Sequence, residues 1–364
     1  MNFLLSEEQE QLLEAVGRYA TEAGDAGARR GAFDGDTGFD EGFWRGLMEM
    51  GVGGVALPPE RGGLGLEMID LALVAEALGH AGAPGPFLGH VLAGLAISWA
   101  GDEAQKQRWL PRLAAGEAVG SIALTASEGS APGQWSGELR GGRLSAERPM
   151  TPYAPQADVI VVGAPGGGLV LVEKGAEGAR AAALDVTDRT RRLWTLTLEQ
   201  TPCEPLAGAS EEVVRRVLDA ANVLLAADAF GGATFVLGLA RDYANTRTQF
   251  GGPIGRFQGL KHQLANMAAR VEPIRGLYWY AAHAFDHVPE ESTRVAALAK
   301  AHASECFMQT ARDAIEAHGG IGYTWDYDAQ IWLKRAMFDY AFLGTPDVHR
   351  AHAARLAGWC GQAA

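Results

Sequence analysis

The sequence predicts a mainly α-helical protein with a β domain in its middle, because the pattern of apolar residues changes twice along the chain. Helical periodicity fills the first third, short apolar or alternating runs between glycine-rich turns follow, and long helical segments make up the rest. A chain of 364 residues can bury a large core and is long enough for roughly two or three compact units. We therefore expect an N-terminal helical bundle at residues 1–117, a middle β domain at 118–205 and a C-terminal four-helix bundle at 206–364.

The N-terminal helices begin with a capping signal. Ser6 followed by Gln9 is the pattern of a capping box, and Leu12 and Val16 lie on one face of the helix that it opens. Asp102 is expected to cap another, short helix. Further helical patterns occur at residues 43–50, at 67–78 and from the proline-rich segment 84–86 to about Trp99.

The middle of the chain reads as a β domain that ends near Pro205. Glycine-rich turns at residues 141–142 and 166–168 separate its apolar runs. The strands that we expect are at residues 121–124, 159–162 and 169–172.

The last part of the chain predicts four long helices with short links, which favours a bundle. Their expected ranges are 208–246, 257–287, 290–318 and 327–356. The segment from Leu224 to Ala240 is near the minimum length for a membrane span, but it holds Asp228 and several small residues. We expect this segment to be a buried helix of the bundle, and no association with a membrane.

The composition excludes several classes of protein. An apolar fraction of 48% and a charged fraction of 21% are ordinary for a soluble protein, and the net charge of −13 argues against binding nucleic acid. Cys203, Cys306 and Cys360 are widely spaced, which predicts neither a disulfide framework nor a metal site. The N-terminus lacks the pattern of a signal peptide. A cytoplasmic location is therefore expected.

One turn between two helices carries an unusual set of side chains. In Thr246–Gln258, the sequence Gly251-Gly252-Pro253 must end one helix and allow the next to begin. Two arginines, two glutamines and two phenylalanines surround this break, and they could meet a phosphate with charged groups and an aromatic ring with flat faces. The alternative is a helix–helix loop with ordinary surface charge.

The turn resembles the flavin-contacting segment of the acyl-CoA dehydrogenase family, in the string Arg-x-Gln-Phe-Gly-x-Pro-Ile-x-x-Phe-Gln from Arg247 to Gln258. Three further segments resemble family segments in the same order: residues 102–116, residues 123–125 with 129–130, and residues 318–324. The resemblance covers nearly the full length of the chain. It implies the same helix, β and helix architecture with a β-barrel-like middle domain, FAD as the cofactor and an acyl-CoA thioester as the substrate.

The resemblance also implies which residues contact FAD, with the turn reaching a flavin that a neighbouring subunit mainly holds. These residues are Arg247, Gln249, Phe250, Gln258, Gly319, Gly320, Thr125, Ser130 and Thr345. Other interpretations stay open, because Gly319 and Gly320 also suit a helix C-cap, and Thr125 and Ser130 could be plain turn and strand residues. Glu316 stands where the family often has glutamine, and an acid near a pyrophosphate is unfavourable.

The catalytic base is the point at which the chain departs from the family. The family's reaction passes an α-proton to a carboxylate while the β-hydride passes to flavin, and in many members the base is a glutamate directly before Gly-Thr. Here Leu343 takes that place, and Ala221 occupies a second known place for the base. Asp228 lies two turns from Ala221 on an otherwise apolar stripe, so we expect it as the candidate base. The alternative is an acid paired with an arginine or lysine of a neighbouring helix.

The resemblance leaves part of the thioester site intact, because an oxyanion-type hydrogen bond from the Leu343 backbone N–H does not need a glutamate side chain. Asp347 and His349 follow on the final helix, where surface or capping positions are expected.

The chain is therefore expected to be an FAD-dependent acyl-CoA dehydrogenase subunit that resembles the base-lacking chains of heteromeric bacterial enzymes, some of which act on steroid or other bulky acyl-CoA thioesters. A second dehydrogenase-like subunit would complete a heterotetramer, and an electron-transfer flavoprotein would accept the electrons. Three alternatives remain: a homo-oligomer that uses Asp228 as its base, a flavin monooxygenase on the same fold, or a structural partner that holds flavin without doing chemistry.

Overall fold

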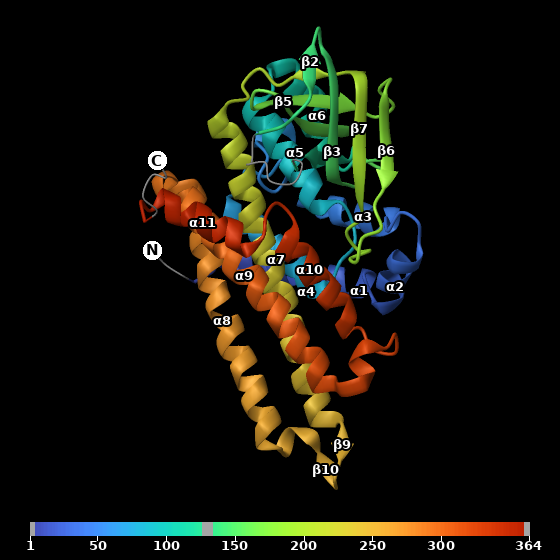
Figure 1. The fold of residues 1–364 in the computed structure, drawn as a ribbon, viewed down its shortest axis with the longest axis vertical. Helices are drawn as coiled ribbons and strands as arrows, with labels where there is room; N and C mark the ends of the chain where they lie inside the picture. Colours follow the sequence, from blue (N-terminus) through green and yellow to red (C-terminus); the bar gives the residue numbers. More distant parts are fainter. Residues whose placement is uncertain (1–3, 126–133, 360–364) are drawn as a thin grey trace. The chain divides into compact units, whose positions relative to one another are not determined.

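The computed structural model describes residues 4–125 and 134–359 (Figure 1). The chain forms two compact units, each built from separate stretches. The first, which we call the helical unit, contains Met1–Arg30, Ala72–Ala83 and Asn222–Ala364, and the second, the sheet unit, contains Gly31–Leu71 and Pro84–Ala221. Along the chain the elements follow the predicted order of helices, strands and helices, so the predicted fold class is confirmed. The predicted domain limits near residues 117 and 205 stay a prediction. The chain passes from one unit to the other after residues 30, 71, 83 and 221 instead.

The first part of the chain is helical, as expected. Ser6 and Gln9 form the predicted capping box, and Asp102 forms another with Gln105. One short helix was not predicted, because only Ala32 and Phe33 of its nine residues are buried and they give no periodic stripe. The elements are α1 (Glu7–Ala23), α2 (Ala26–Asp34), α3 (Glu41–Glu49), η1 (Val52–Gly54), η2 (Pro59–Arg61), α4 (Met68–Ala81), α5 (Phe87–Ala100) and α6 (Glu103–Ala114).

The predicted barrel-like domain takes the form of two four-stranded sheets in the sheet unit. One sheet has the order β1-β4-β5-β8, with β1 parallel to β4, and the other has the antiparallel order β2-β3-β7-β6. The strands are β1 (Gly120–Ala123), β2 (Glu138–Arg140), β3 (Arg143–Pro152), β4 (Val159–Ala164), β5 (Gly168–Glu173), β6 (Ala179–Ala183), β7 (Leu193–Pro202) and β8 (Glu204–Pro205). The sequence analysis named β1, β4 and β5, which are buried almost throughout, and did not name β3, β7, β8 or the more exposed β2 and β6.

Helix α5 is joined to the first sheet through a buried histidine. The backbone N–H of Gly120 donates to Nδ1 of His90 at 3.2 Å, and the other ring nitrogen lies 3.1 Å from the carbonyl oxygen of Leu113. Because Nδ1 accepts, Nε2 carries the hydrogen and the ring is neutral. Burial lowers the pKa of His90 to about 4, which agrees with a neutral ring at pH 7.

Tyr153 ties together three loop segments of the sheet unit. Its hydroxyl accepts a hydrogen bond from the Gly85 N–H at 3.0 Å and lies 2.7 Å from the carbonyl oxygen of Thr190 and 3.2 Å from that of Gly38. The ring packs in the core of the sheets beside Trp194. A single buried side chain thus orders segments that have no regular structure to hold them.

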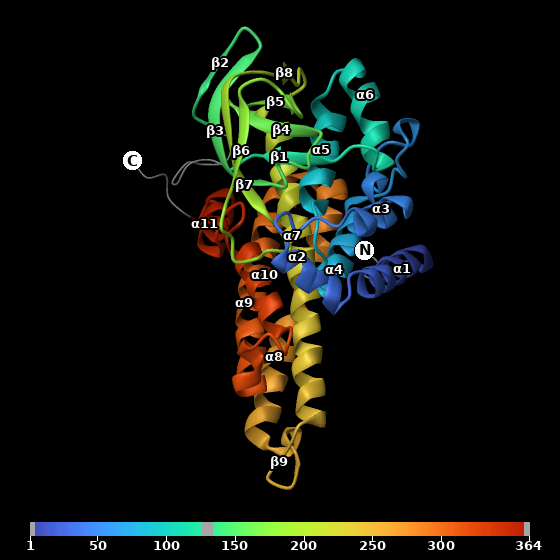
Figure 2. The ribbon, with the colours of Figure 1, turned by 90° about the vertical axis from the view of Figure 1, so that its right-hand side faces the viewer.

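The helical unit contains the long helices of the last part of the chain. In Figures 1 and 2, α8 and α9 run side by side, and β9 and β10 lie between the ends of α7 and α8. The elements are α7 (Glu211–Thr246), β9 (Thr248–Gln249), β10 (Gly252–Pro253), η3 (Ile254–Arg256), α8 (Gln258–His287), α9 (Pro289–His318), η4 (Gly319–Tyr323), α10 (Ala329–Ala341) and α11 (Pro346–Leu356).

One predicted helix is wrong. The range 327–356 forms two helices, α10 and α11, with a short link between them. Leu343 and Gly344 in this link have positive φ values of 57° and 118°, which a continuous helix cannot contain. Pro346 then begins α11 at a position that needs no backbone N–H donor.

Helix α7 is apolar and long enough to pass a membrane-span test, yet 72% of its most apolar window is buried in the protein. That burial agrees with the expected core helix. Helix α4 packs closely against it, and glycines allow the approach: a Cβ on Gly231 would overlap the carbonyl oxygen of Glu76 and lie 2.7 Å from the backbone nitrogen of His80. A Cβ on Gly79 would meet the Asp228 backbone. The two helices therefore pack backbone to backbone.

We expect Gly231→Ala to lower the free energy of unfolding by roughly 1–3 kcal/mol or more, because the methyl group has only backbone to displace. Gly238→Ala is the matched control on the same helix, since nothing lies within 4 Å of its added Cβ. It should stabilise by up to about 1 kcal/mol through helix propensity. Equilibrium urea unfolding measures both, and equal effects would contradict the close approach.

Candidate functional site

The predicted cofactor turn is an ordered hairpin at the junction of α7 and α8. β9 and β10 pair antiparallel, and the Ile254 N–H donates to the Arg247 carbonyl oxygen at 2.9 Å. Phe250 and Gly251 form the tip with φ values of 52° and 82°, the left-handed pair that a tight two-residue hairpin needs. Phe250 is 84% exposed, with Phe257 packed edge-on against it at 6.0 Å between ring centroids.

The polar side chains of this hairpin differ in whether they have a partner within the chain. Arg256 donates to the Phe250 carbonyl oxygen and lies over the Phe257 ring, so it stabilises the turn itself. Gln249 is exposed and donates to the Thr248 carbonyl oxygen at 2.9 Å, and Gln258 is exposed at the start of α8. The guanidinium of Arg247 is exposed and has no hydrogen-bond or ion-pair partner among residues 4–125 and 134–359. Arg247 is therefore a cation that this chain leaves open.

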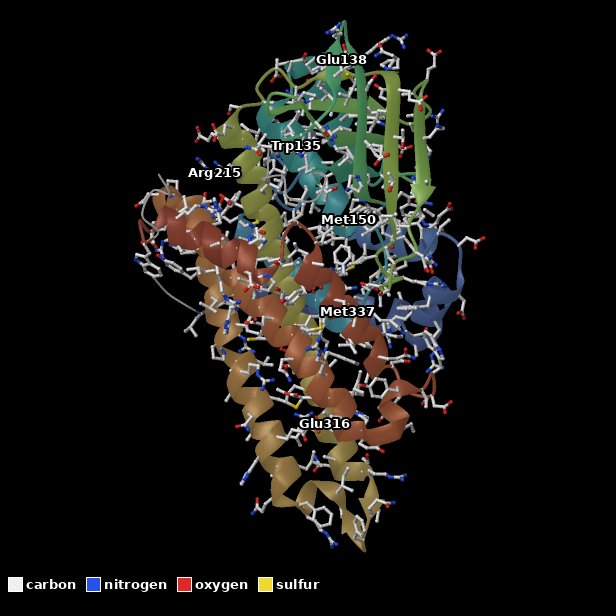
Figure 3. The ribbon with its side chains drawn as sticks, viewed as in Figure 1. Trp135, Glu138, Met150, Arg215, Glu316 and Met337 are labelled. Atoms are coloured by element: carbon white, nitrogen blue, oxygen red, sulfur yellow. The ribbon has the colours of Figure 1, made fainter. Side chains whose placement is uncertain are left out.

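The predicted glycine cluster lies at the end of α9, in the same unit. Gly319 ends α9 with φ 65°, its N–H caps the Glu316 carbonyl, and nothing lies within 4 Å of a Cβ added to Gly319 or Gly320. Both features hold at once: the segment is a helix cap, and its backbone is open to a close-lying ligand. Figure 3 labels the exposed side chain of Glu316 near the end of α9.

The glycine cluster is joined to the last turns of α7. His318 stacks on Tyr243 at 4.4 Å between ring centroids, and Tyr327 packs against both rings. Tyr243 precedes Arg247 by one helical turn, so this stack couples the hairpin's base to the cap of α9. The structure thus brings together two segments that are far apart in the sequence.

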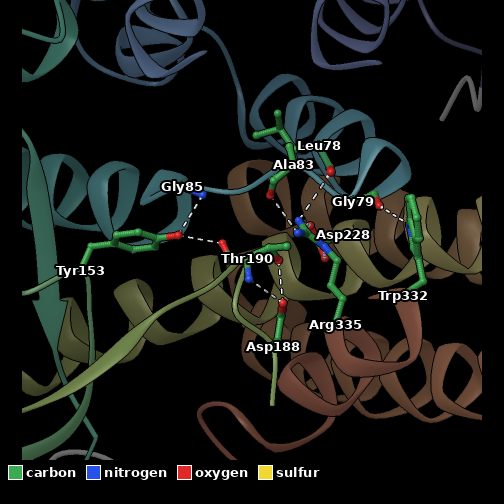
Figure 4. Close-up of polar contacts among 10 residues, drawn as sticks. All are labelled: Leu78, Gly79, Ala83, Gly85, Tyr153, Asp188, Thr190, Asp228, Trp332 and Arg335. Atoms are coloured by element: carbon green, nitrogen blue, oxygen red, sulfur yellow. Dashed lines mark hydrogen bonds and ion pairs between the residues drawn. The ribbon is translucent and has the colours of Figure 1, made fainter. Parts of the chain in front are cut away.

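Asp228 lies in the middle of α7, only 4% exposed, and its carboxylate is engaged by Arg335 of α10 (Figure 4). The two guanidinium contacts are Nε to Oδ2 at 3.0 Å and Nη2 to Oδ1 at 2.6 Å. Arg335 also donates to the carbonyl oxygens of Ala83 at 2.9 Å and Leu78 at 3.5 Å. This arrangement matches the alternative in which the acid pairs with a neighbouring helix. Asp228 as the base stays a prediction, and proton uptake there would break a buried bidentate pair.

The link between α10 and α11 holds the predicted base position. Leu343 is half-buried, and among the residues that the structure describes no group accepts a hydrogen bond from its backbone N–H. Thr345 follows as the N-cap of α11, and its hydroxyl makes no capping bond. The link therefore offers an open amide donor and a hydroxyl within three residues.

Two buried side chains, Lys300 and His349, support this link, and the sequence analysis gave neither of them this role. Lys300 of α9 donates through Nζ to the carbonyl oxygens of Tyr340, at 3.1 Å, and Gly344. A surface or capping position was expected for His349, and the surface position is wrong: His349 is buried, with Nε2 3.0 Å from the place of a Cβ on Gly344. Burial and nearby Lys300 lower the pKa of His349 to about 3, so the ring is neutral at pH 7. Asp347 is exposed, as expected.

The sheet unit contains the remaining predicted residues. Thr125 is buried and its hydroxyl donates to the Pro149 carbonyl oxygen, while Ser130 lies outside the described residues. Next to Pro149, Met150 has φ 54° where the pairing of β3 with β7 shifts register (Figure 3). Thr125 is therefore tied to an irregular stretch of β3.

Arg148, which the sequence analysis missed, anchors that irregular stretch from inside the sheets. It is fully buried and donates to the carbonyl oxygens of Gly163, at 3.0 and 2.7 Å, and Ser136, at 3.0 Å. Burial lowers its pKa to about 10, so the guanidinium remains charged at pH 7. An arginine in an otherwise alternating strand gave no sequence signal for this role.

Two family descriptions match most of the chain. Acyl-CoA dehydrogenase, N-terminal domain, matches residues 6–117, and acyl-CoA dehydrogenase, C-terminal domain, matches residues 212–357. A curated relative, acyl-CoA dehydrogenase IpdE2 from Mycobacterium tuberculosis, is 34% identical over 344 residues, which are 93% of this chain and 94% of that protein.

Solved structures of the same fold cover nearly the whole chain. A steroid ACAD variant described as Tcur3481-Tcur3483 is 28% identical, with a TM-score of 0.89 and coverage of 97% of this chain and 98% of that one. The ChsE4-ChsE5 complex from Mycobacterium tuberculosis has a TM-score of 0.88 at 24% identity, covering 99% and 100% of the two chains, which shows the fold alone.

The pairing of Asp228 with Arg335 makes a stability prediction. Asp228→Asn should lower the free energy of unfolding by roughly 3–5 kcal/mol, because it leaves a buried guanidinium without its counter-ion. The double variant Asp228→Leu with Arg335→Met should be much less destabilised than the two single variants together, since no charge stays buried. Urea unfolding of all four proteins gives the coupling. Unchanged stability of Asp228→Asn together with lost dehydrogenation would instead favour Asp228 as the base.

Proposed function

This chain belongs to the acyl-CoA dehydrogenase family, and we propose that it is a base-lacking subunit that completes its FAD sites and its catalytic base with a second dehydrogenase-like chain. The observation that carries the proposal is the α10–α11 link. There the Leu343 N–H is open to an acceptor, while the Leu343 side chain cannot accept a proton. The chain thus has the backbone donor for a thioester oxygen and lacks the carboxylate that would take the proton.

The reaction that we propose is the α,β-dehydrogenation of an acyl-CoA thioester. The α C–H bond breaks with transfer of its proton to a carboxylate, the β C–H bond breaks with transfer of a hydride, and the electron pair left at the α-carbon forms the new double bond. FAD supplies the hydride acceptor when it is bound. The Leu343 N–H would donate to the thioester oxygen, where negative charge develops as the proton leaves. This chain's residues would thus orient and polarise the substrate.

The carboxylate that takes the proton would come from the partner chain. Leu343 and Ala221 occupy the two places known for the base in the family. The remaining candidate in this chain, Asp228, is held by both guanidinium contacts of Arg335. These three positions favour an external base over a self-sufficient homo-oligomer.

The residues of the helical unit fit a flavin contact at a subunit boundary. Arg247 is a cation without an intrachain partner, and Phe250 exposes an aromatic face on a rigid tip. The open backbone at Gly319 and Gly320 allows close approach of a phosphate group. We include Gln249, Gln258, Thr345, Thr125 and Ser130 in the proposed FAD contacts, with an electron-transfer flavoprotein as the acceptor and a cytoplasmic location.

The first test compares this chain purified alone with the complex that it forms when a second dehydrogenase-like chain is co-expressed. We expect little flavin and no acyl-CoA-dependent dye reduction from the chain alone, and both from the complex. Short-chain, long-chain and steroid-side-chain acyl-CoA thioesters serve as probes. About one flavin per chain in the isolated protein, with dehydrogenation that Asp228→Asn abolishes, would overturn the proposal in favour of a self-sufficient enzyme.

Arg247→Ala should weaken FAD retention in the complex by roughly tenfold or more without changing its melting temperature, because the variant removes a charge-assisted contact. Arg241→Ala is the control on the same helix, since Arg241 is exposed and pairs with Asp242 instead. Fluorescence of released FAD measures the dissociation. Equal retention in the two variants would remove Arg247 from the site.

A further inference from the structure

Lys300 is the least expected charge in the helical unit. Its side chain is 0% exposed, and α9 carries it in an alanine-rich run. An ammonium group taken out of water must find partners, and Nζ donates to the carbonyl oxygens of Tyr340 and Gly344. Burial lowers the pKa of Lys300 to about 8, against the opposing attraction of buried Asp339. Its contacts are directed at one feature, the α10–α11 link.

The two carbonyl groups bracket the open amide of the link. Tyr340 precedes Leu343 by three residues and Gly344 follows it directly, so the Lys300 ammonium holds the chain on both sides of the Leu343 N–H. The Gly344 N–H donates back to the Ala341 carbonyl oxygen at 3.2 Å. The short stretch of chain that contains the Leu343 N–H is thereby held on both sides.

The backbone of the link is held in a conformation that a leucine rarely adopts. Leu343 has φ 57° and Gly344 has φ 118°, and such residues persist only where the surroundings over-determine them. His349 closes the other side, because its Nε2 lies 3.0 Å from the place of a Cβ on Gly344, a tight contact for any side chain there. The chain retains this strained turn although its leucine can do no proton chemistry. What the turn still presents is the backbone N–H.

We propose that Lys300 is a positioning residue for the dehydrogenation, which fixes the Leu343 N–H in the direction of the thioester oxygen by holding the carbonyl groups of Tyr340 and Gly344. The inference rests on the proposed function, because the thioester oxygen is the acceptor in that function. A donor aimed at developing charge acts through its placement, so a small reorientation of the amide lowers the rate of proton removal more than it weakens binding of the substrate.

The test uses the flavin-loaded complex with the co-expressed partner, and rates are normalised to bound flavin. Lys300→Met keeps the length of the side chain and removes all three donors, and Lys300→Gln keeps an amide donor. Lys174→Met, at an exposed lysine paired with Asp158, controls for loss of a positive charge. We expect kcat to fall by about tenfold or more in Lys300→Met and by less in Lys300→Gln, with KM for the acyl-CoA changed by less than about threefold.

A second readout follows the hydrogen bond itself. An acyl-CoA with a ¹³C-labelled thioester carbonyl and no hydrogen on its β-carbon binds without reacting, and its infrared carbonyl band shifts to lower frequency when the amide donates to it. Lys300→Met should reduce that shift, whereas Lys174→Met should not. If Lys300→Met fails to fold, Lys300→Gln carries the same comparison, with an intermediate shift and an intermediate kcat.

A third readout separates this inference from the proposed function. Amide hydrogen exchange of residues 340–346, measured on the chain itself, should accelerate in the Lys300 variants whether or not the complex dehydrogenates anything. A wild-type complex without acyl-CoA-dependent activity would overturn the proposed function. An active wild-type complex whose Lys300 variants keep kcat, the carbonyl shift and slow exchange in the link would overturn the role of Lys300 alone.

Discussion

The helical unit depends on one buried ion pair, between Asp228 and Arg335, because its contacts join three segments of the chain. The pair itself links α7 to α10, and the remaining donors of Arg335 reach carbonyl groups at the end of α4. The Leu78 carbonyl oxygen also accepts a hydrogen bond from the Ala83 N–H at 2.9 Å, so these contacts lie together where α4 ends and its last carbonyl groups lack the usual helical donors. One guanidinium thus neutralises a buried carboxylate and caps a helix end, which is the geometry that repays desolvation.

The same three segments, α4, α7 and α10, are also joined by close backbone packing and by Trp332. Backbone approaches backbone at Gly79 and Gly231, and Trp332 of α10 donates its indole N–H to the Gly79 carbonyl oxygen at 3.2 Å. Phe235 of α7 stacks on the Trp332 ring at 3.8 Å between centroids. With α10 fixed along its length by Arg335 and Trp332, the link that follows it starts from a defined position. Lys300 then needs to order only the few residues from Tyr340 to Gly344.

The parts of the fold that could be predicted from the sequence are those that local periodicity encodes. The limits of α7, α8 and α9 agree with the expected ranges to within a few residues, and the capping boxes at Ser6 and Asp102 are present. The break in the final helix was missed although Gly344 and Pro346 both signal one. Strands β2 and β6 were missed because exposure hides their alternation.

The candidate site was predictable only in its exposed segments. The local sequence from Arg247 to Gln258 is enough to predict a turn there. The partner of Asp228 lies 107 residues away, and no pattern in the sequence identifies it. The available signal was a charge inside an apolar stretch. It marked Asp228, and it would also have marked Lys300 and Arg335, since α9 and α10 carry those charges among alanine, isoleucine and tryptophan. Such a signal identifies a buried charge, whereas its role depends on which helix ends or carboxylates the fold brings to it.

The arrangement separates two tasks that a single glutamate and its backbone normally share at this turn. The side chain of such a residue removes the proton, and the N–H of the same residue polarises the thioester, so loss of the carboxylate does not by itself remove the reason to keep the turn. Here the turn is kept by a buried ammonium, a buried neutral imidazole and a glycine whose φ of 118° other residues rarely adopt. A chain that only held flavin would gain nothing from a strained leucine with an open N–H, because strain at one position must be offset by contacts elsewhere. The preserved turn therefore favours a subunit that still takes part in substrate recognition over one that serves only as a scaffold.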